Sequence, residues 1–479
     1  MPRVVIVGAG ISGLAVAYRL QQLLPAAQIT ILEQRERPGG TVWTERQDGF
    51  QVETGPNGFL DTKPATLNLC RDLGLGERLV PASEAAGKNR YLFLDGKLKP
   101  LPGGLLSFLA TDLLSWRGKL GLFLERFRRP RQDDRDESID AFARRRAGRE
   151  AAEVFADALV TGIYAGDPTL LSLPATFPRL AALEREHGSV LKGLGQAARE
   201  RRAKAKANSE AYQRPGRMWS FREGLRLLIE TLQGRLDARP LFGVDVRQLS
   251  TEEGPEGRPI WVVSADGRDS WTADAVVLAC PAYRQAGLLA EVDRELAEEV
   301  AGIAYNRIAV VALGYRREDV PGGLNGFGFI APQRARCNVL GVQWCSSIYP
   351  DRAAAGTVLL RAMCGGWHRA EVAGYPDERL LEVVRAELAV AMGVRAAPLF
   401  HRIIRWDRAI PQYHLGHLER VARIEACAAR YPGLFLAGNA YHGVALNDCT
   451  ERGEILATRI HDYFTSPHLL RFPGASSHP

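Results

Sequence analysis

Three glycines near the start of the chain, spaced as Gly8-x-Gly10-x-x-Gly13, constrain the fold more than any other feature. They lie between an apolar run at residues 4–7, typical of a buried parallel strand, and a stretch at 11–24 that predicts a helix. Residues 28–32 predict a second strand. The spacing therefore predicts a βαβ unit that opens an α/β fold.

This arrangement of glycines is typical of a dinucleotide site. Gly8 permits the tight turn, Gly10 lets a pyrophosphate approach the backbone, and Gly13 lets the helix pack closely on the strand. The N-terminal end of the helix offers free N–H groups and a positive dipole to the phosphates. Glu33 follows Gly13 by 20 residues, at the end of the second predicted strand, where a carboxylate can accept hydrogen bonds from a ribose.

Length and charge narrow the class of protein. The chain has 479 residues, so two or three domains are expected. It contains 62 Lys and Arg against 55 Asp and Glu, a formal charge of +7 that favours anionic partners. The basic residues are dispersed, so no nucleic-acid partner is expected. Seven cysteines without a CxxC pair argue against a disulfide framework and favour a cytoplasmic protein.

Residues 105–127 stand out because they are very apolar, have helical periodicity and end among several arginines. Two interpretations stay open for them. In the first, the stretch lies on the inner face of the cell membrane and inserts Phe108, Trp116 and Phe123 into the membrane interface. In the second, it forms an ordinary pair of core helices. No stretch reaches the about 20 apolar residues of a transmembrane helix.

Motifs far from the N-terminus resemble one flavoprotein group. The pair Gly39-Gly40 and the segment 433–449 (GLFLAGNAYHGVALNDC) are similar to motifs of amine oxidases, phytoene desaturases and protoporphyrinogen oxidases. The segments T-G-I-Y-A-G-D at 161–167 and I-P-Q-Y at 410–413 resemble the bacterial oxygen-dependent protoporphyrinogen oxidases. So does E-T-G-P-N-G-F at 53–59, in which Gly58 replaces the usual serine. The resemblance covers residues 4 to about 463.

The resemblance implies FAD as cofactor and three regions. We expect a Rossmann-type FAD-binding domain assembled from residues 1–85, 215–290 and 430–465. A mixed-sheet substrate-binding domain is expected at 86–100 and 291–429, an all-α insertion with a membrane-associating role left open at 101–214, and a tail at 466–479. The predicted cofactor-binding residues are Gly8, Gly10, Ile11, Ser12, Gly13, Glu33, Gln34, Arg35, Gly39, Gly40, Thr41, Gly55, Pro56, Asn57, Val246, Gly438, Asn439, Gly443, Val444, Ala445 and Asn447.

Four residues are predicted to bind the substrate. By the resemblance, Arg90 pairs with a propionate of a tetrapyrrole, in agreement with the preference of guanidinium for carboxylates. Gly162 lies near the reactive edge of the substrate, Tyr349 packs against the ring and Ile330 forms an apolar wall. Surface exposure for Arg90 and core packing for Tyr349 and Ile330 are the alternatives.

The implied reaction is the six-electron oxidation of protoporphyrinogen IX to protoporphyrin IX, with O2 as acceptor. No side chain is predicted to be catalytic, because the flavin performs the chemistry. Alternatives are a coproporphyrinogen III oxidase, a flavin oxidoreductase acting on amines or carotenoids, and a flavin-binding scaffold without turnover. His414 and His417 have no further ligand at metal spacing, so no metal is expected. The oligomeric state is left as monomer or homodimer.

Overall fold

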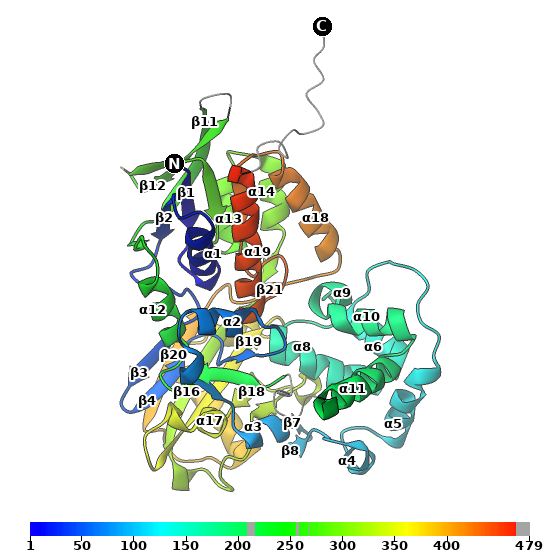
Figure 1. Cartoon of the computed structure of the whole chain (residues 1–479). Coiled ribbons are helices and arrows are strands. Elements are labelled where there is room, and N and C mark those ends of the chain that lie inside the picture. The colour runs from blue at the N-terminus through cyan, green and yellow to red at the C-terminus, as the bar shows by residue number, and fades with distance from the viewer. Residues whose placement is uncertain (208–215, 255–257, 268, 466–479) are drawn as a thin grey trace.

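The computed structural model describes residues 1–207, 216–254, 258–267 and 269–465. The predicted tail at 466–479 lies outside these residues. Figure 1 shows three regions: a sheet with helices on both faces that contains the N-terminus, a second large sheet, and a group of helices beside it. The prediction of an α/β fold with a Rossmann-type region, a mixed sheet and a helical insertion is confirmed.

The first sheet is parallel and is built from distant parts of the chain. Its strand order is β10-β2-β1-β14-β22. The strands are β1 (Arg3–Val7), β2 (Gln28–Glu33), β10 (Leu241–Phe242), β14 (Ala275–Leu278) and β22 (Leu434–Leu436). The β1 and β14 strands are almost fully buried, as expected for a sheet covered on both faces.

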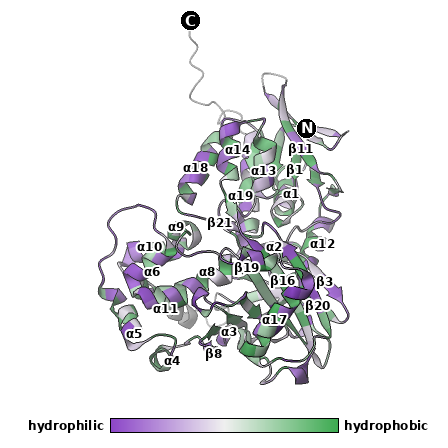
Figure 2. Ribbon diagram, turned by 180° about the vertical axis from the view of Figure 1, so that it is seen from behind, coloured by the Kyte–Doolittle hydropathy of each residue, from purple (hydrophilic) through white to green (hydrophobic). Residues whose placement is uncertain are grey.

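Helices cover both faces of this sheet. One face packs against α1 (Ile11–Leu23), α2 (Ala65–Asp72), α12 (Arg226–Gly234) and α19 (Leu446–Thr465). The other packs against α13 (Ala282–Leu289), α14 (Arg294–Ala301), α18 (His417–Ala428) and an antiparallel sheet of β11 (Val246–Glu253), β12 (Pro259–Ala265) and β13 (Ser270–Ala273). Figure 2 shows the apolar residues concentrated on the inner strands, whereas α6 and α18 are largely hydrophilic.

The second sheet is mixed and has seven strands in the order β20-β16-β19-β18-β17-β7-β8. All neighbours are antiparallel except β17 and β7. The strands are β7 (Tyr91–Leu94), β8 (Lys97–Pro100), β16 (Arg307–Arg316), β17 (Gly328–Ile330), β18 (Val339–Gln343), β19 (Thr357–Gly366) and β20 (Phe400–Trp406). The helices α16 (Ala370–Ala373) and α17 (Asp377–Met392) share its core.

Shorter elements connect the two sheets. These are β3 (Thr44–Gln47) with β4 (Phe50–Glu53); β5 (Phe59–Leu60), β6 (Leu79–Pro81) and β9 (Met218–Phe221); and β15 (Ala304–Tyr305) with β21 (Pro411–Gln412). Two short helices pack together: α15 (Cys345–Ile348) contacts β19 of the second sheet, and α3 (Glu84–Lys88) contacts α15.

The helical region begins with residues 105–127, the stretch with helical periodicity. The structure divides it into α4 (Leu105–Ala110), α5 (Trp116–Phe123) and a 3-10 turn (Leu124–Phe127). The break is stabilised by Ser115, whose hydroxyl accepts the amide of Gly118 at 3.2 Å and whose own amide donates to Glu150 at 2.7 Å. The stretch is therefore helical but interrupted, with two short helices.

The remaining helices of this region follow directly. They are α6 (Ile139–Ala147), α7 (Arg149–Ala151), a π-helical turn (Ala152–Ala156), α8 (Asp157–Tyr164), α9 (Leu173–Thr176), α10 (Pro178–His187) and α11 (Val190–Ala207). In the described part of the chain, no helix is both long enough and apolar enough to cross a membrane.

Candidate functional site

A cleft of about 320 Å³ opens at the carboxyl ends of the strands of the parallel sheet. This is the edge at which open α/β sheets bind ligands. Thirteen of the predicted cofactor-binding residues line the cleft: Gly8, Gly10, Ile11, Ser12, Glu33, Gln34, Arg35, Gly39, Gly40, Thr41, Val246, Gly438 and Asn439.

The glycine turn between β1 and α1 is held from both sides. Gly8 has a φ of +110°, a conformation that side chains rarely adopt, and a Cβ atom on Gly13 would overlap the carbonyl oxygen of Gly8. The buried carboxylate of Glu33 accepts the amides of Ala9 at 2.8 Å and Arg35 at 2.9 Å. Glu33 therefore fixes the shape of the turn, a role that the sequence pattern did not predict.

The cleft suits a dinucleotide with a diphosphate. No heavy atom of the described residues would lie within 4 Å of a Cβ atom on Gly10, so the backbone is open to a ligand there. Three arginines, Arg35, Arg284 and Arg408, line the cleft; Arg284 pairs with Asp245, and the other two supply positive charge. The N-terminal end of α1 begins at Ile11 beside this space. These features fit the FAD that the sequence predicts.

Not all predicted cofactor-binding residues line this cleft. Gly13 lies beneath it, where it packs on Gly8. Gly55, Pro56 and Asn57 follow β4, and Gly55 packs against the backbone of Thr41, which lines the cleft. The buried Nδ2 of Asn57 has no hydrogen-bond partner among the described residues. Such a buried donor is available for a hydrogen bond to a polar ligand.

The remaining predicted cofactor-binding residues lie at the start of α19. Gly443, Val444 and Ala445 precede this helix, and the Asp448 carboxylate accepts the amide of Ala445 at 3.0 Å. Asn447 is buried and donates to the carbonyl of Leu60, which joins the C-terminal segment to the N-terminal one. The role of these residues toward FAD stays a prediction.

One wall of the cleft consists of residues that were not predicted from the sequence. It is formed by Tyr283, Tyr305, Trp406 and Arg408, together with Arg284. Trp406 stacks beneath Arg35, with 5.2 Å from the guanidinium carbon to the ring centroid, and donates to the carbonyl of Thr54 at 2.9 Å. These residues lie on separate elements without a local motif, so only the tertiary structure brings them together.

A second cavity of about 400 Å³ lies between α8 and the mixed sheet. Arg90, Gly162 and Ile330, three of the four predicted substrate-binding residues, line it. A Cβ atom on Gly162 would lie 2.7 Å from Cδ1 of Ile330. The two linings meet in the chain, where Ala409 of the cleft is followed by Ile410 of the second cavity.

Arg90 is the one charged residue among the described residues that line this second cavity. Its guanidinium lies 5.2 Å from the ring centroid of Phe327 and forms no ion pair with another described residue. Burial lowers the pKa of Arg90 below its ordinary value. By accessible surface Arg90 is nevertheless an exposed residue, and an unpaired guanidinium that solvent and substrate can both reach is suited to binding a carboxylate.

Tyr349 lies outside this cavity. Its side chain is 2% exposed and packs with Ala82, Ala86 and Ile348, and burial raises its pKa. A Cβ atom on Gly58 would lie 2.7 Å from the Tyr349 hydroxyl. Glycine at position 58 therefore leaves room for this hydroxyl. The ring-packing role of Tyr349 stays a prediction.

The two most specific motifs contact each other. In the segment 161–167, the carbonyl of Tyr164 accepts Nδ2 of Asn306 at 2.8 Å and Nε2 of Gln412 at 3.0 Å. The amide of Ser172 donates to the carbonyl of Tyr413 at 2.8 Å. The I-P-Q-Y segment therefore fixes the end of α8, the helix that carries Gly162.

His414 and His417 do not form a metal site with the residues around them. The ring of His417 stacks on Tyr413 at 3.9 Å and its Nε2 donates to the carbonyl of Tyr441 at 3.1 Å, whereas His414 contacts Trp367 edge-on. Within the described ranges, no group of three or more His, Cys, Asp or Glu residues is placed to hold a metal.

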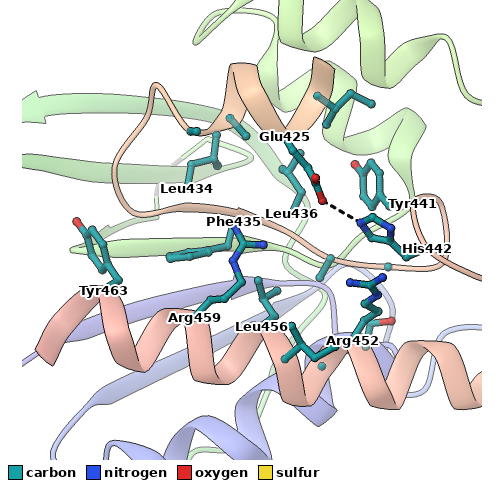
Figure 3. A pocket seen from close by; sticks show the side chains of 18 of the residues that line it. Glu425, Leu434, Phe435, Leu436, Tyr441, His442, Arg452, Leu456, Arg459 and Tyr463 are labelled. Carbon is teal, nitrogen blue, oxygen red and sulfur yellow. Dashed lines mark hydrogen bonds and ion pairs between the residues drawn. The ribbon is translucent and has the colours of Figure 1, made fainter. Parts of the chain in front are cut away.

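A third cavity, of about 350 Å³, lies between α18, α19 and the edge strand β22 (Figure 3). Arg452 and Arg459 of α19 extend into it, and His442 pairs with Glu425 at 2.9 Å across it. It contains none of the predicted substrate-binding residues and shares only Ser12, Gly438 and Cys449 with the cofactor cleft. We therefore place the chemistry at the other two cavities.

Comparison with known proteins agrees with this geometry. The family model for flavin containing amine oxidoreductases matches residues 11–461. Protoporphyrinogen oxidase of Homo sapiens is 34% identical over 95% of this chain and 98% of its own length. Chloroplastic protoporphyrinogen oxidase 1 of Arabidopsis thaliana is 32% identical, over 96% and 88%. Coproporphyrinogen III oxidase of Bacillus subtilis (strain 168) is 29% identical, over 94% and 96%.

Solved structures show the same fold. A crystal structure from Exiguobacterium sp. 255-15 superposes with a TM-score of 0.82 at 28% identity, and covers 96% of this chain and 98% of that one. Cyclohexylamine oxidase from Brevibacterium oxydans IH-35A superposes with a TM-score of 0.69 at 16% identity, over 97% and 99%. The latter similarity concerns the fold alone. The chain belongs to the family of flavin containing amine oxidoreductases and is an FAD-dependent enzyme.

Proposed function

We propose that this enzyme oxidises protoporphyrinogen IX to protoporphyrin IX with O2 as electron acceptor. The observation that carries the proposal is the cavity beside the cofactor cleft: its walls are apolar, and Arg90 supplies its charge. A tetrapyrrole with acidic side chains matches both features, because its ring system is apolar and its carboxylates can pair with Arg90. The names of the similar proteins point to the same class of substrate.

The residues of the two cavities would act by binding and orientation. The glycine turn, Glu33 and the arginines of the cleft hold the dinucleotide, which supplies a hydride acceptor when bound. Gly162 and Ile330 confine the substrate between α8 and the sheet, and Arg90 binds a carboxylate. The apolar walls exclude water from the reacting edge. We likewise propose the division into FAD-binding, substrate-binding and helical domains expected from the sequence, except that α14 and α18 pack on the parallel sheet and so belong with the FAD-binding domain.

Coproporphyrinogen III is the second candidate, because relatives with that activity in their names are similarly close. Coproporphyrinogen carries four propionates and protoporphyrinogen two. Four carboxylates in an apolar cavity would require more than one cation, since an unpaired buried charge is costly. Arg90 is the one charged residue on the cavity lining within the described residues, so the cavity favours the substrate with fewer carboxylates.

We further propose that the helical region contacts the surface of a membrane. An apolar patch is exposed on α4, α5 and the following turn, with Leu106 84%, Trp116 72% and Phe127 70% exposed. The rest of the patch consists of Leu105, Leu109, Leu120, Phe123 and Leu124. Arg117 and Arg129 are exposed beside it, in position to contact lipid phosphates.

An aerobic assay with both porphyrinogens tests the proposed reaction. Porphyrin fluorescence should rise with both substrates, faster and at lower KM with protoporphyrinogen IX. A faster rise with coproporphyrinogen III would favour the second candidate. No enzyme-dependent rise with either substrate, from protein that contains FAD, would refute the proposed function.

A further inference from the structure

Gln343, a polar residue on β18, lines the second cavity across the sheet from Arg90. Gln343 at the end of β18 pairs with Gly328 of β17, and the register of β17 with β7 places Arg90 on the other side of Gly328. Neighbouring strands are about 4.8 Å apart, so the two backbones are about 10 Å apart. Gly328 places no side chain between them.

The amide of Gln343 is held in one orientation. Its Oε1 accepts Nη1 of Arg361 at 3.1 Å, and the pairing of β18 with β19 puts these two residues directly opposite. A guanidinium only donates hydrogen bonds, so the amide must turn its oxygen toward Arg361 and its NH2 group away from it. Among the described residues, no group accepts a hydrogen bond from Nε2 of Gln343.

Arg361 is itself rigidly placed. It is 5% exposed, and its Nη2 donates to the carbonyl of Gly55, in the loop that adjoins the cofactor cleft. The guanidinium therefore connects that loop to the wall of the second cavity. A buried side chain fixed at two points can determine the orientation of the amide that it contacts.

We propose that Gln343 is a second anchor for the substrate, with Nε2 donating a hydrogen bond to a carboxylate, and that Arg361 is the positioning residue. This inference rests on the proposed function. The NH2 group is a donor, and the pyrrole N–H groups of a porphyrinogen are donors too, so the matching acceptors are the carboxylate oxygens. A substrate with two carboxylates meets one donor at Arg90 and another at Gln343.

The test compares protoporphyrinogen IX with its dimethyl ester in the wild-type holoenzyme and in Gln343→Leu. For the diacid, Gln343→Leu should raise KM about tenfold, the effect of losing a hydrogen bond to a charged group, with kcat within about twofold. For the ester, KM should change much less, because the charged acceptor is gone. Met363→Leu, which replaces another residue of the cavity lining at similar volume, should leave the ratio of the two KM values unchanged.

Two further variants separate anchoring from packing. Gln343→Glu should raise KM for the diacid more than Gln343→Leu, since a carboxylate beside the substrate carboxylate repels it. Arg361→Lys should lower the preference for the diacid, and combining it with Gln343→Leu should add little further loss. If Arg361→Lys does not retain FAD, the two Gln343 variants are sufficient to test whether Gln343 anchors the substrate.

Equal changes in KM for diacid and ester, or no change in Gln343→Leu and Gln343→Glu, would overturn the inference. Failure of the proposed function looks different, because the wild-type enzyme would then oxidise neither porphyrinogen. In that case, equilibrium binding of protoporphyrin IX and its dimethyl ester to the holoenzyme gives the same comparison without turnover. Equal affinity loss for both porphyrins in Gln343→Leu would again contradict the anchor.

Discussion

Gly162 and Ile330 face each other across the second cavity, so closely that a Cβ atom on the glycine would lie 2.7 Å from Cδ1 of the isoleucine. Gly162 lies in α8, where alanine is favoured over glycine by about 1 kcal/mol. Glycine at this position therefore keeps space free in the cavity, although alanine would stabilise the helix more.

Gly162→Ala should keep or raise the melting temperature while it raises KM for the porphyrinogen several-fold. The double variant with Ile330→Val, which removes the methyl group that the new Cβ atom meets, should recover most of the lost affinity. Steady-state kinetics and thermal unfolding of the three variants check this. Loss of stability in Gly162→Ala without a change in KM would contradict the role given to this pair.

Gly10→Ala tests the cofactor cleft. Because no described atom lies within 4 Å of the added Cβ, the protein should fold with unchanged stability as apoprotein. The methyl group would occupy space needed by the diphosphate, so the affinity for FAD should fall at least tenfold in a fluorescence titration. Gly195→Ala, an equally open position in α11 outside the cleft, is the control and should bind FAD normally. Unchanged FAD affinity in Gly10→Ala would place the cofactor elsewhere.

His417 should make the protein sensitive to acid. Burial lowers its pKa to about 4, from an ordinary value of 6.5, so the folded state binds this proton less readily than the unfolded state. The stabilisation is complete above pH 6.5 and is lost as the pH falls toward 4, by up to about 3 kcal/mol.

His417→Gln keeps a donor for the carbonyl of Tyr441 but does not titrate. Its urea-unfolding midpoint should therefore change less between pH 7 and pH 5 than that of the wild type. His461→Gln, at a half-buried position near the end of α19, is the control and should behave as wild type. The same acid sensitivity in His417→Gln would assign the effect to other groups.

The apolar patch predicts binding to lipid vesicles. Wild-type protein should float with vesicles that contain phosphatidylglycerol, and the variant Trp116→Ser/Phe127→Ser should float much less, because it removes two large exposed side chains. Its activity toward soluble porphyrinogen should be retained, since neither residue lines the second cavity. Absence of wild-type flotation would favour a soluble protein with an unusually apolar surface.

Local patterns were sufficient to predict the parts of the site that depend on backbone shape. The glycine turn, Glu33 and the strand before Gly438 are encoded by spacing and apolar runs, and the structure places them in one cleft. Gly162 and Ile330 were identified by resemblance, and the structure shows them in contact distance.

Features that depend on long-range contacts escaped prediction. Trp406 and Arg408 reach the cleft from β20 and the loop after it, with no motif to mark them. The stretch 105–127 has continuous helical periodicity, yet it breaks where Ser115 is held by Glu150 of another helix. Arg361 and Gln343 meet only through the register of two strands, which the sequence does not specify.

Anaerobic mixing of the holoenzyme with protoporphyrinogen IX tests the central claim most directly. Without O2, each protein-bound FAD can accept only two of the six electrons, so little porphyrin should form while the visible flavin absorption bleaches. Admission of air should then restore it. A flavin band that stays unchanged over many minutes with excess protoporphyrinogen IX and excess coproporphyrinogen III would contradict the account.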